Sequence, residues 1–190
     1  MIGDINSNAI LFKYSPKGMG RLTADHLTYS GVQASRTFAQ QDEGRVDALK
    51  TAFENIGTAL AIPPALLAAI ASRESRCGKL LDKEGYGDNG HAFGIMQIDN
   101  RCNTVLGLPN PESSMHITQA AHKLKSFWWQ VSKDHPDWPG EYQLLGAVAA
   151  YNFGPGNVKT MEGIDQGTTH NDYANDVWAR AQYYTGHVGE

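Results

Sequence analysis

The chain has 190 residues, of which 41% are hydrophobic, 19% charged and 9% aromatic, a length and composition that fit one ordinary globular domain. Its net charge of −4 excludes the basic footprint of a protein that binds nucleic acid or an anionic membrane. No apolar stretch approaches the about 20 residues that a membrane-spanning helix needs.

The N-terminal end of the chain is polar and contains glycine and proline. This composition predicts an irregular segment over residues 1–20, followed by one domain over residues 21–190. The segment lacks the charged n-region and the long apolar h-region of a signal peptide. On this ground the chain either stays in the cell or is a mature form with an added Met.

The next stretch predicts helices of increasing regularity. Residues 23–41 have a weakly helical pattern that Gly31 interrupts. Asp42 is predicted to be the N-cap of a helix over residues 43–61. Apolar residues recur there at steps of three and four, which is typical of an amphipathic helix: Val46, Leu49, Phe53, Ile56 and Leu60.

A largely apolar helix follows. Pro63 and Pro64 suit its first turn, and it is expected to end near Glu74 or Ser75. Residues 78–103 contain five glycines, and the apolar pattern around Phe93 predicts one or two short strands. Further helices are predicted over residues 116–133, 141–153 and 171–184. The expected class is therefore α+β, mainly α: a helical domain with a buried central helix and a small β-sheet.

Glu74 is an unusual residue for the end of an apolar helix. It shares a face with Leu67 and Ile70, and it lies at the helix end where the macrodipole disfavours negative charge. Apolar surroundings raise the pKa of a carboxyl, and a carboxylic acid that stays protonated can donate a proton to a leaving group. The alternative is a structural ion pair with Arg73 or Arg76.

Asp88 and Asp99 follow Glu74 on a Gly-rich segment, and the three carboxylates lie within 26 residues. Asp88 lies in an Asp-Asn-Gly turn, and Asp99 follows the strand-like GIMQI. Taken singly, each is explained by a turn or by the polar end of a strand. Together with Glu74 they offer one acid in apolar surroundings and carboxylates in polar ones, which two-carboxylate glycoside cleavage requires.

A Tyr-Asn pair ends another apolar helix. Tyr151 and Asn152 precede a Gly-Pro-Gly turn in AVAAYNFGPGN. The turn is no phosphate cradle, because no Gly-Lys-Ser/Thr follows it. A ring face and an amide at a cleft suit a sugar, whereas a core role would require the amide to find a partner.

Five motifs in one order carry a resemblance to a known family: SRESRCGKLL, GYGDNGHAFGIMQIDNR, HITQAAHKL, AVAAYNFGPGNV and GTTHNDYANDVWARAQYY. They resemble goose-type lysozymes, over roughly residues 20–187. The shorter pattern ES, GIMQI and AYN is shared with the wider lysozyme-like superfamily, which includes lytic transglycosylases. The resemblance implies a lysozyme-like fold with its sheet beside an active-site cleft.

The resemblance also implies an activity: hydrolysis of the β-1,4 bond between N-acetylmuramic acid and N-acetylglucosamine in bacterial peptidoglycan, as antibacterial defence. Glu74 matches the general acid, and Asp88 and Asp99 match two aspartates that hold the attacking water of an inverting enzyme. Positions that match the saccharide-lining residues of the family are Phe127, Tyr151, Asn152 and Tyr173. Asn103 stands where a sugar-contacting His is expected.

The expected partners are bacterial peptidoglycan and N-acetylglucosamine oligosaccharides, with no nucleic acid and no membrane, for a protein that we expect to be monomeric. No metal or other cofactor is implied, because this cleavage needs only carboxyls and water. By family analogy the protein is extracellular or lysosomal, with a cytoplasmic form left open. The only cysteines, Cys77 and Cys102, are expected to be free thiols rather than one disulfide.

Three other functions remain as alternatives. A lytic transglycosylase would close a 1,6-anhydro ring without water, which would leave Asp88 and Asp99 without a role. A non-catalytic peptidoglycan-binding module would not need Glu74. A helical interaction protein would leave all three carboxylates unexplained.

Overall fold

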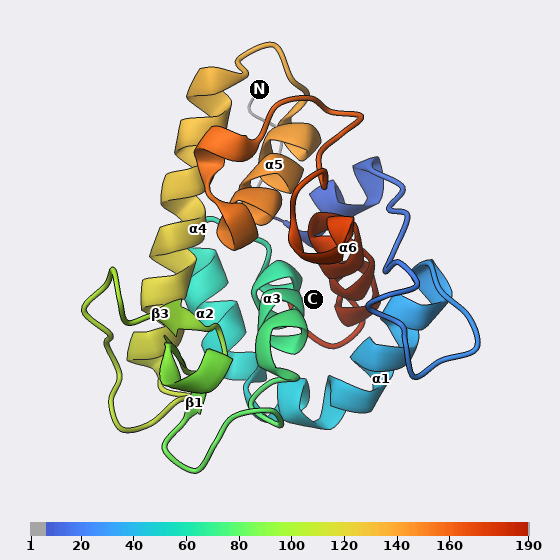
Figure 1. Cartoon of the computed structure of the whole chain (residues 1–190). Helices are drawn as coiled ribbons and strands as arrows, with labels where there is room; N and C mark the ends of the chain where they lie inside the picture. Colours follow the sequence, from blue (N-terminus) through green and yellow to red (C-terminus); the bar gives the residue numbers. More distant parts are fainter. Residues whose placement is uncertain (1–6, 190) are drawn as a thin grey trace.

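Helices surround one central helix in the computed structural model, which describes residues 7–189 (Figure 1). The α-helices are α1 Val32–Ala48, α2 Lys50–Leu60, α3 Pro64–Ser75, α4 Ser114–Asp134, α5 Gly140–Phe153 and α6 Tyr173–Tyr184. Short 3-10 helices are η1 Asn8–Lys13, η2 Asp88–Gly90, η3 Pro155–Asn157 and η4 Thr169–Asn171. None of the described helices is both long and apolar enough to span a membrane. The predicted class, α+β and mainly α, is confirmed.

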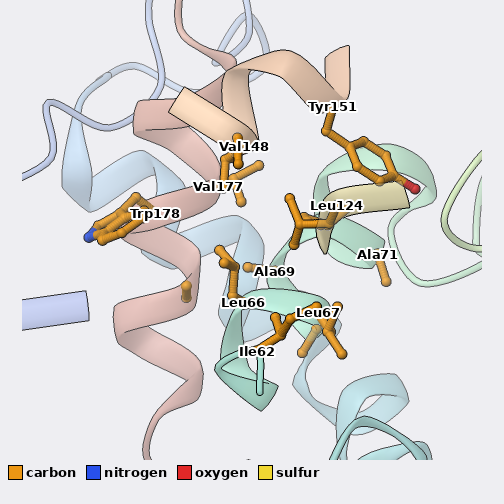
Figure 2. Packing of buried hydrophobic residues seen from close by; sticks show 14 of the residues in the cluster. Ile62, Leu66, Leu67, Ala69, Ala71, Leu124, Val148, Tyr151, Val177 and Trp178 are labelled. Atoms are coloured by element: carbon orange, nitrogen blue, oxygen red, sulfur yellow. The ribbon is translucent and has the colours of Figure 1, made fainter. Parts of the chain in front are cut away.

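The central helix is α3. Pro64 begins it, where a missing N–H costs nothing because first-turn N–H groups have no partner inside a helix. Every residue of α3 is buried except Arg73 and Glu74. Its most extensive packing is against α6, and it also packs on α1 and α2. Figure 2 shows apolar side chains of four helices meeting there: Leu66, Leu67, Leu124, Val148, Val177 and Trp178.

The helix ends on Arg76 in the left-handed region, with φ 55° and ψ 42°. The N–H of Cys77 donates to the carbonyl of Ala71 at 3.0 Å, and the N–H of Arg76 to that of Ser72 at 3.0 Å. This helix ending usually has glycine in the left-handed position, and another residue there costs roughly 1–2 kcal/mol. The side chain of Arg76 accounts for the exception, because its guanidinium pairs with the buried carboxylate of Asp42 at 2.7 Å.

The prediction that Asp42 caps a helix was wrong. Helix α1 begins after Gly31 and runs through Asp42, whose carboxylate accepts from Arg45 at 2.5 Å and from Ser72 at 2.7 Å instead of from free N–H groups. The helix expected over residues 43–61 is therefore two helices, divided at Leu49. An Asp that serves tertiary partners in a helix interior has the same sequence appearance as one that caps a helix.

Part of the segment expected to be irregular is ordered against the core. Residues Asn8–Lys13 form η1, in which Ile10 and Leu11 are buried. The indole N–H of Trp178 donates to the carbonyl of Leu11 at 2.8 Å, which joins η1 to α6. Two apolar side chains and several long-range hydrogen bonds, among them those of Asn8 with the C-terminal end of the chain, thus order a polar-looking segment. The prediction for residues 1–6 lies outside the described residues.

The sheet has three antiparallel strands in the order β1–β2–β3, one more than the upper expectation. They are β1 Tyr86–Gly87, β2 Ala92–Phe93 and β3 Ile98–Asp99, with Tyr86 opposite Phe93 and Ala92 opposite Asp99. Side chains of three helices hold the stretch between β2 and β3. The Met96 N–H donates to His116 Nε2 at 3.0 Å, Tyr151 Oη donates to the Met96 carbonyl at 2.7 Å, and Ser75 Oγ donates to the Ile95 carbonyl at 2.9 Å.

Candidate active site

Glu74 lies in the last turn of α3 and keeps some exposure to solvent. The hydroxyl of Tyr173, at the start of α6, donates a short hydrogen bond to Glu74 Oε1. Burial raises the pKa of the Glu74 carboxyl, while the Tyr173 hydrogen bond and the positive charges of Lys123 and Arg73 act in the opposite direction. The balance is upward, so Glu74 keeps its proton to a higher pH than an ordinary glutamic acid.

The two arginines beside Glu74 in the sequence have other partners. Arg73 pairs with Asp172 at 3.0 Å and with Asp176 at 2.5 Å, both close to the start of α6. Arg76 pairs with Asp42. Within residues 7–189 neither guanidinium forms an ion pair with Glu74, so the alternative of a structural ion pair is wrong.

A buried ion network lies behind the acid. Asp176 is fully buried and accepts from Arg73 and from Arg180, the latter at 2.8 Å. Burial alone would raise the pKa of Asp176, but Arg180 and Arg73 outweigh it and lower the pKa. Because Arg73 belongs to α3 while Asp176 and Tyr173 belong to α6, the network holds the Tyr173 hydroxyl against Glu74.

The two aspartates lie on the sheet and share one arginine. Asp99 ends β3, and Asp88 follows β1 with φ 46°, a conformation that Asp tolerates better than most residues. Arg101 Nη2 lies 2.6 Å from Asp99 Oδ2 and 3.5 Å from Asp88 Oδ2. The hydrogen bonds from Arg101 lower the pKa of Asp99 to about 2. Sequence reasoning missed Arg101, although its place two residues after Asp99 in one motif was the available signal.

The residues predicted to line the saccharide cleft have distinct neighbours. Tyr151 is 5% exposed, and its hydroxyl donates a hydrogen bond to the Met96 carbonyl. Asn152 Oδ1 accepts from the N–H of Thr169 at 2.9 Å, and Asn103 Nδ2 donates to the carbonyl of Asp99 at 2.9 Å. Phe127 is half-buried on α4. Tyr173 contacts the acid itself. Their contact with a sugar stays a prediction.

A pocket of about 520 Å³ lies beyond the end of α5, lined by Phe153, Asn157 and Gly167 among others. None of the three carboxylates predicted to be catalytic lines it.

The two cysteines are free thiols, as expected: Cys77 is buried and Cys102 is exposed. Burial raises the pKa of Cys77 to about 12, so this thiol stays protonated. Cys77, which comes just after α3, is therefore an apolar residue of the core.

Comparisons with known proteins show which family the chain resembles over most of its length. The family model described as Lysozyme g matches residues 14–188. Over 163 residues the chain is 50% identical to Lysozyme g of Casuarius casuarius, an alignment that covers 86% of each protein. It is 49% identical to Lysozyme G of Dromaius novaehollandiae over 163 residues, 86% of this chain and 78% of that protein. With Lysozyme g of Gallus gallus it shares 45% identity over 161 residues, 85% of this chain and 75% of that protein.

Proposed function

We propose an inverting mechanism for this chain, which belongs to the lysozyme g family and is a glycoside hydrolase that cleaves bacterial peptidoglycan. The bond cut is the β-1,4 linkage between N-acetylmuramic acid and N-acetylglucosamine. In an inverting enzyme one carboxylic acid protonates the leaving oxygen, and a carboxylate on the opposite sugar face activates water. The single observation that carries the proposal is that Arg101 brings Asp88 and Asp99 together as a second carboxylate site, in addition to the acid Glu74 that the Tyr173 hydroxyl holds.

Glu74 is the general acid in this mechanism. Its raised pKa keeps a proton available for the glycosidic oxygen, and the Tyr173 hydroxyl holds the carboxyl in one orientation. When the proton has left, the Tyr173 hydroxyl and the charge of Lys123 stabilise the carboxylate that remains. The same contacts therefore serve both protonation states of the acid.

Asp99 and Asp88 hold the attacking water. Asp99 is ionised over the whole physiological pH range because its pKa lies at about 2. Arg101 keeps the two carboxylates on one side of the sheet despite their like charge. A low-pKa carboxylate is a weak base, so its main contribution is to orient the water and to stabilise positive charge on the sugar.

The remaining parts of the proposal concern the small substrates, the oligomeric state and the localisation of the enzyme. Oligosaccharides of N-acetylglucosamine are expected to serve as small substrates, and the enzyme is expected to act as a monomer. Delivery outside the cell or into lysosomes would bring it to bacterial walls.

The test is the stereochemistry of the fresh product. Proton NMR of a defined oligosaccharide digest should show the α anomer first for the native enzyme. Mass spectrometry of the same digest should show products with ordinary reducing ends. Glu74→Gln should lower kcat by about 10²–10⁴-fold, while Asp88→Asn and Asp99→Asn should slow the reaction without changing the anomer. Products one water lighter would identify a lytic transglycosylase. Unchanged lysis by Glu74→Gln would favour a binding module and remove Glu74 from the mechanism.

A further inference from the structure

Lys123 is a charged residue of the site that the mechanism does not require as acid or base. It lies on α4, and its ammonium nitrogen is 4.3 Å from the centre of the Tyr151 ring and 5.9 Å from that of the Phe127 ring. It is also close enough to Glu74 on α3 and to Asp99 on β3 to interact electrostatically with both, and with Cys102 after β3. The cation thus faces the acid side and the water side of the site.

This cation has no full counter-charge in the protein. Within the described residues Lys123 makes no ion pair and no hydrogen bond, and its direct partners are the two ring faces. Burial lowers the pKa of its ammonium group, with Glu74 and Asp99 opposing that shift. A half-buried ammonium that has no ion-pair partner among the described residues is available to a negatively charged acceptor that a ligand brings, and hydrogen bonds between such charged groups are among the stronger ones.

The other lysines of α4 show that ring contact alone does not explain Lys123. Lys125 lies 4.7 Å from the Trp128 ring, and Lys133 lies 4.3 Å from the Trp129 ring. Burial lowers the pKa of Lys125, with no contribution from Glu74 or Asp99. Among these lysines Lys123 alone combines a ring face with the two carboxylates of the site.

We propose that Lys123 is a substrate-binding residue that takes a carboxylate of the peptidoglycan chain beside the scissile bond. The inference rests on the proposed function, in which Glu74 and Asp99 flank that bond. N-acetylmuramic acid differs from N-acetylglucosamine by a lactyl ether that ends in a carboxyl group. That group is a free carboxylate in a peptide-free glycan, and it carries a peptide with carboxylates of its own in the native wall. Lys123 would therefore favour muramyl chains over neutral chitin chains.

A second role for Lys123 predicts a different pattern. Its charge lowers the pKa of Glu74, so its loss would raise that pKa whatever the substrate. An effect through Glu74 changes all substrates alike and moves the alkaline limb of the rate profile. A contact with a carboxylate changes only the substrates that have one.

The experiment compares Lys123→Met with Lys125→Met, which removes the same charge from the same helix at a ring contact away from Glu74. Each variant is assayed at its own pH optimum on a neutral N-acetylglucosamine hexamer, a peptide-free muramyl glycan and a peptide-bearing glycan. Lys123→Met should lower kcat/KM about tenfold on at least one of the two muramyl chains, as expected for a hydrogen bond to a charged group, and by less than about twofold on the neutral hexamer. Lys125→Met should change neither.

The two carboxylate sources separate within the same data. A loss confined to the peptide-free glycan assigns the lactyl carboxylate, because that group is an amide in the peptide-bearing chain. A loss confined to the peptide-bearing glycan assigns a stem-peptide carboxylate, and a loss on both shows that either carboxylate reaches Lys123. Lys123→Arg should recover part of the loss. Equal losses on all three substrates, or none on the muramyl ones, would overturn the proposal.

Binding separates this proposal from the proposed function. In a Glu74→Gln background, calorimetry is run with two uncleaved muramyl oligosaccharides, one peptide-free and one peptide-bearing. Lys123→Met should raise the Kd for at least one of them about tenfold and leave the Kd for the neutral hexamer unchanged. If the native enzyme cleaved no glycan, the proposed function would fail while this measurement still decided the role of Lys123. Unchanged Kd values for both muramyl chains would refute the carboxylate contact.

Discussion

The site has an acid side around Glu74 and a water side around Asp88 and Asp99. Both sides contain Arg–Asp ion pairs, which are buried on the acid side and exposed on the water side. On the acid side, Arg73 and Asp176 have 8% and 0% of their side-chain surface exposed and lie between two packed helices. On the water side, Arg101 and Asp88 have 55% and 56% of their side-chain surface exposed, and each lies just after a strand of two residues. Buried pairs cost much when one partner is removed, whereas exposed pairs cost little. The acid is therefore placed by the core of the protein, and the water by a surface hairpin.

The largest effect should come from breaking the buried side of this comparison. Asp176→Asn removes the charge that Arg73 and Arg180 share, and we expect a loss of about 3–5 kcal/mol in the free energy of unfolding, because two buried guanidiniums lose this carboxylate and Asp172 remains for Arg73 alone. Asp99→Asn should leave the urea midpoint nearly unchanged while it lowers activity. Urea denaturation of both variants measures this. Similar midpoints would show that the two sides are equally structural.

A smaller effect, on activity alone, is expected from Arg101→Gln. Arg101 lowers the pKa of Asp99 to about 2, so the carboxylate is ionised above that pH. Without Arg101 its pKa should return toward the ordinary value of about 3.9, and the acid limb of the kcat/KM profile should move up by roughly two pH units. Lys79→Gln, an exposed cation outside the site, is the control. An unmoved limb would mean that Asp99 does not hold the water.

Tyr173→Phe should produce a still smaller change, in the opposite limb. The Tyr173 hydroxyl stabilises the ionised form of Glu74, so its removal raises the pKa of the acid further. Activity that depends on protonated Glu74 is lost as the pH rises through that pKa, and the alkaline limb should therefore move to higher pH. Tyr183→Phe removes a hydroxyl that donates to Glu43 at 2.5 Å and should not move it. A shift to lower pH in Tyr173→Phe would contradict the assigned hydrogen bond.

The smallest effect is expected from modifying the exposed thiol. Iodoacetamide should alkylate Cys102 on the folded protein and leave Cys77 intact, because Cys77 is buried and its pKa lies at about 12. The melting temperature should not change. Intact-mass analysis counts the adducts, with Cys102→Ser as the control that takes up none. Two adducts at native pH would show that the end of α3 opens readily.

The sequence predicted the helices whose apolar residues are periodic. Residues 116–133 and 141–153 were expected, and the helices found are Ser114–Asp134 and Gly140–Phe153. The burial of α3 was also foreseen, because its residues are apolar on all sides. Contacts between distant residues could not be foreseen. Asp42 reads as a cap because its partners Arg76 and Ser72 come some thirty residues later.

For the candidate site, too, the sequence indicated local settings but not contacts between distant residues. The contrast between an apolar setting for Glu74 and polar ones for Asp88 and Asp99 was visible in local composition. The partners of Arg73 were not, because Asp172 and Asp176 lie about a hundred residues further on. Tyr173 was predicted as a sugar contact, and its hydrogen bond to Glu74 appears only when α6 packs on α3. Family resemblance pointed to the three carboxylates. The packing of the helices was needed to identify the partner of Glu74, whereas Arg101, the partner of Asp99, lies only two residues further along the chain.

The peptide groups of Met96 have a consequence for how the molecule opens. Its N–H is held by His116 of α4 and its carbonyl by Tyr151 of α5, and the neighbouring Ile95 carbonyl is held by Ser75 of α3. Strands of two residues would ordinarily fray in local fluctuations. Here the amide of Met96 can exchange with deuterium only when a helix contact breaks as well. The stretch between β2 and β3 should therefore exchange in the same cooperative unit as the helical core, and the site should lose its water side and its acid side in one transition.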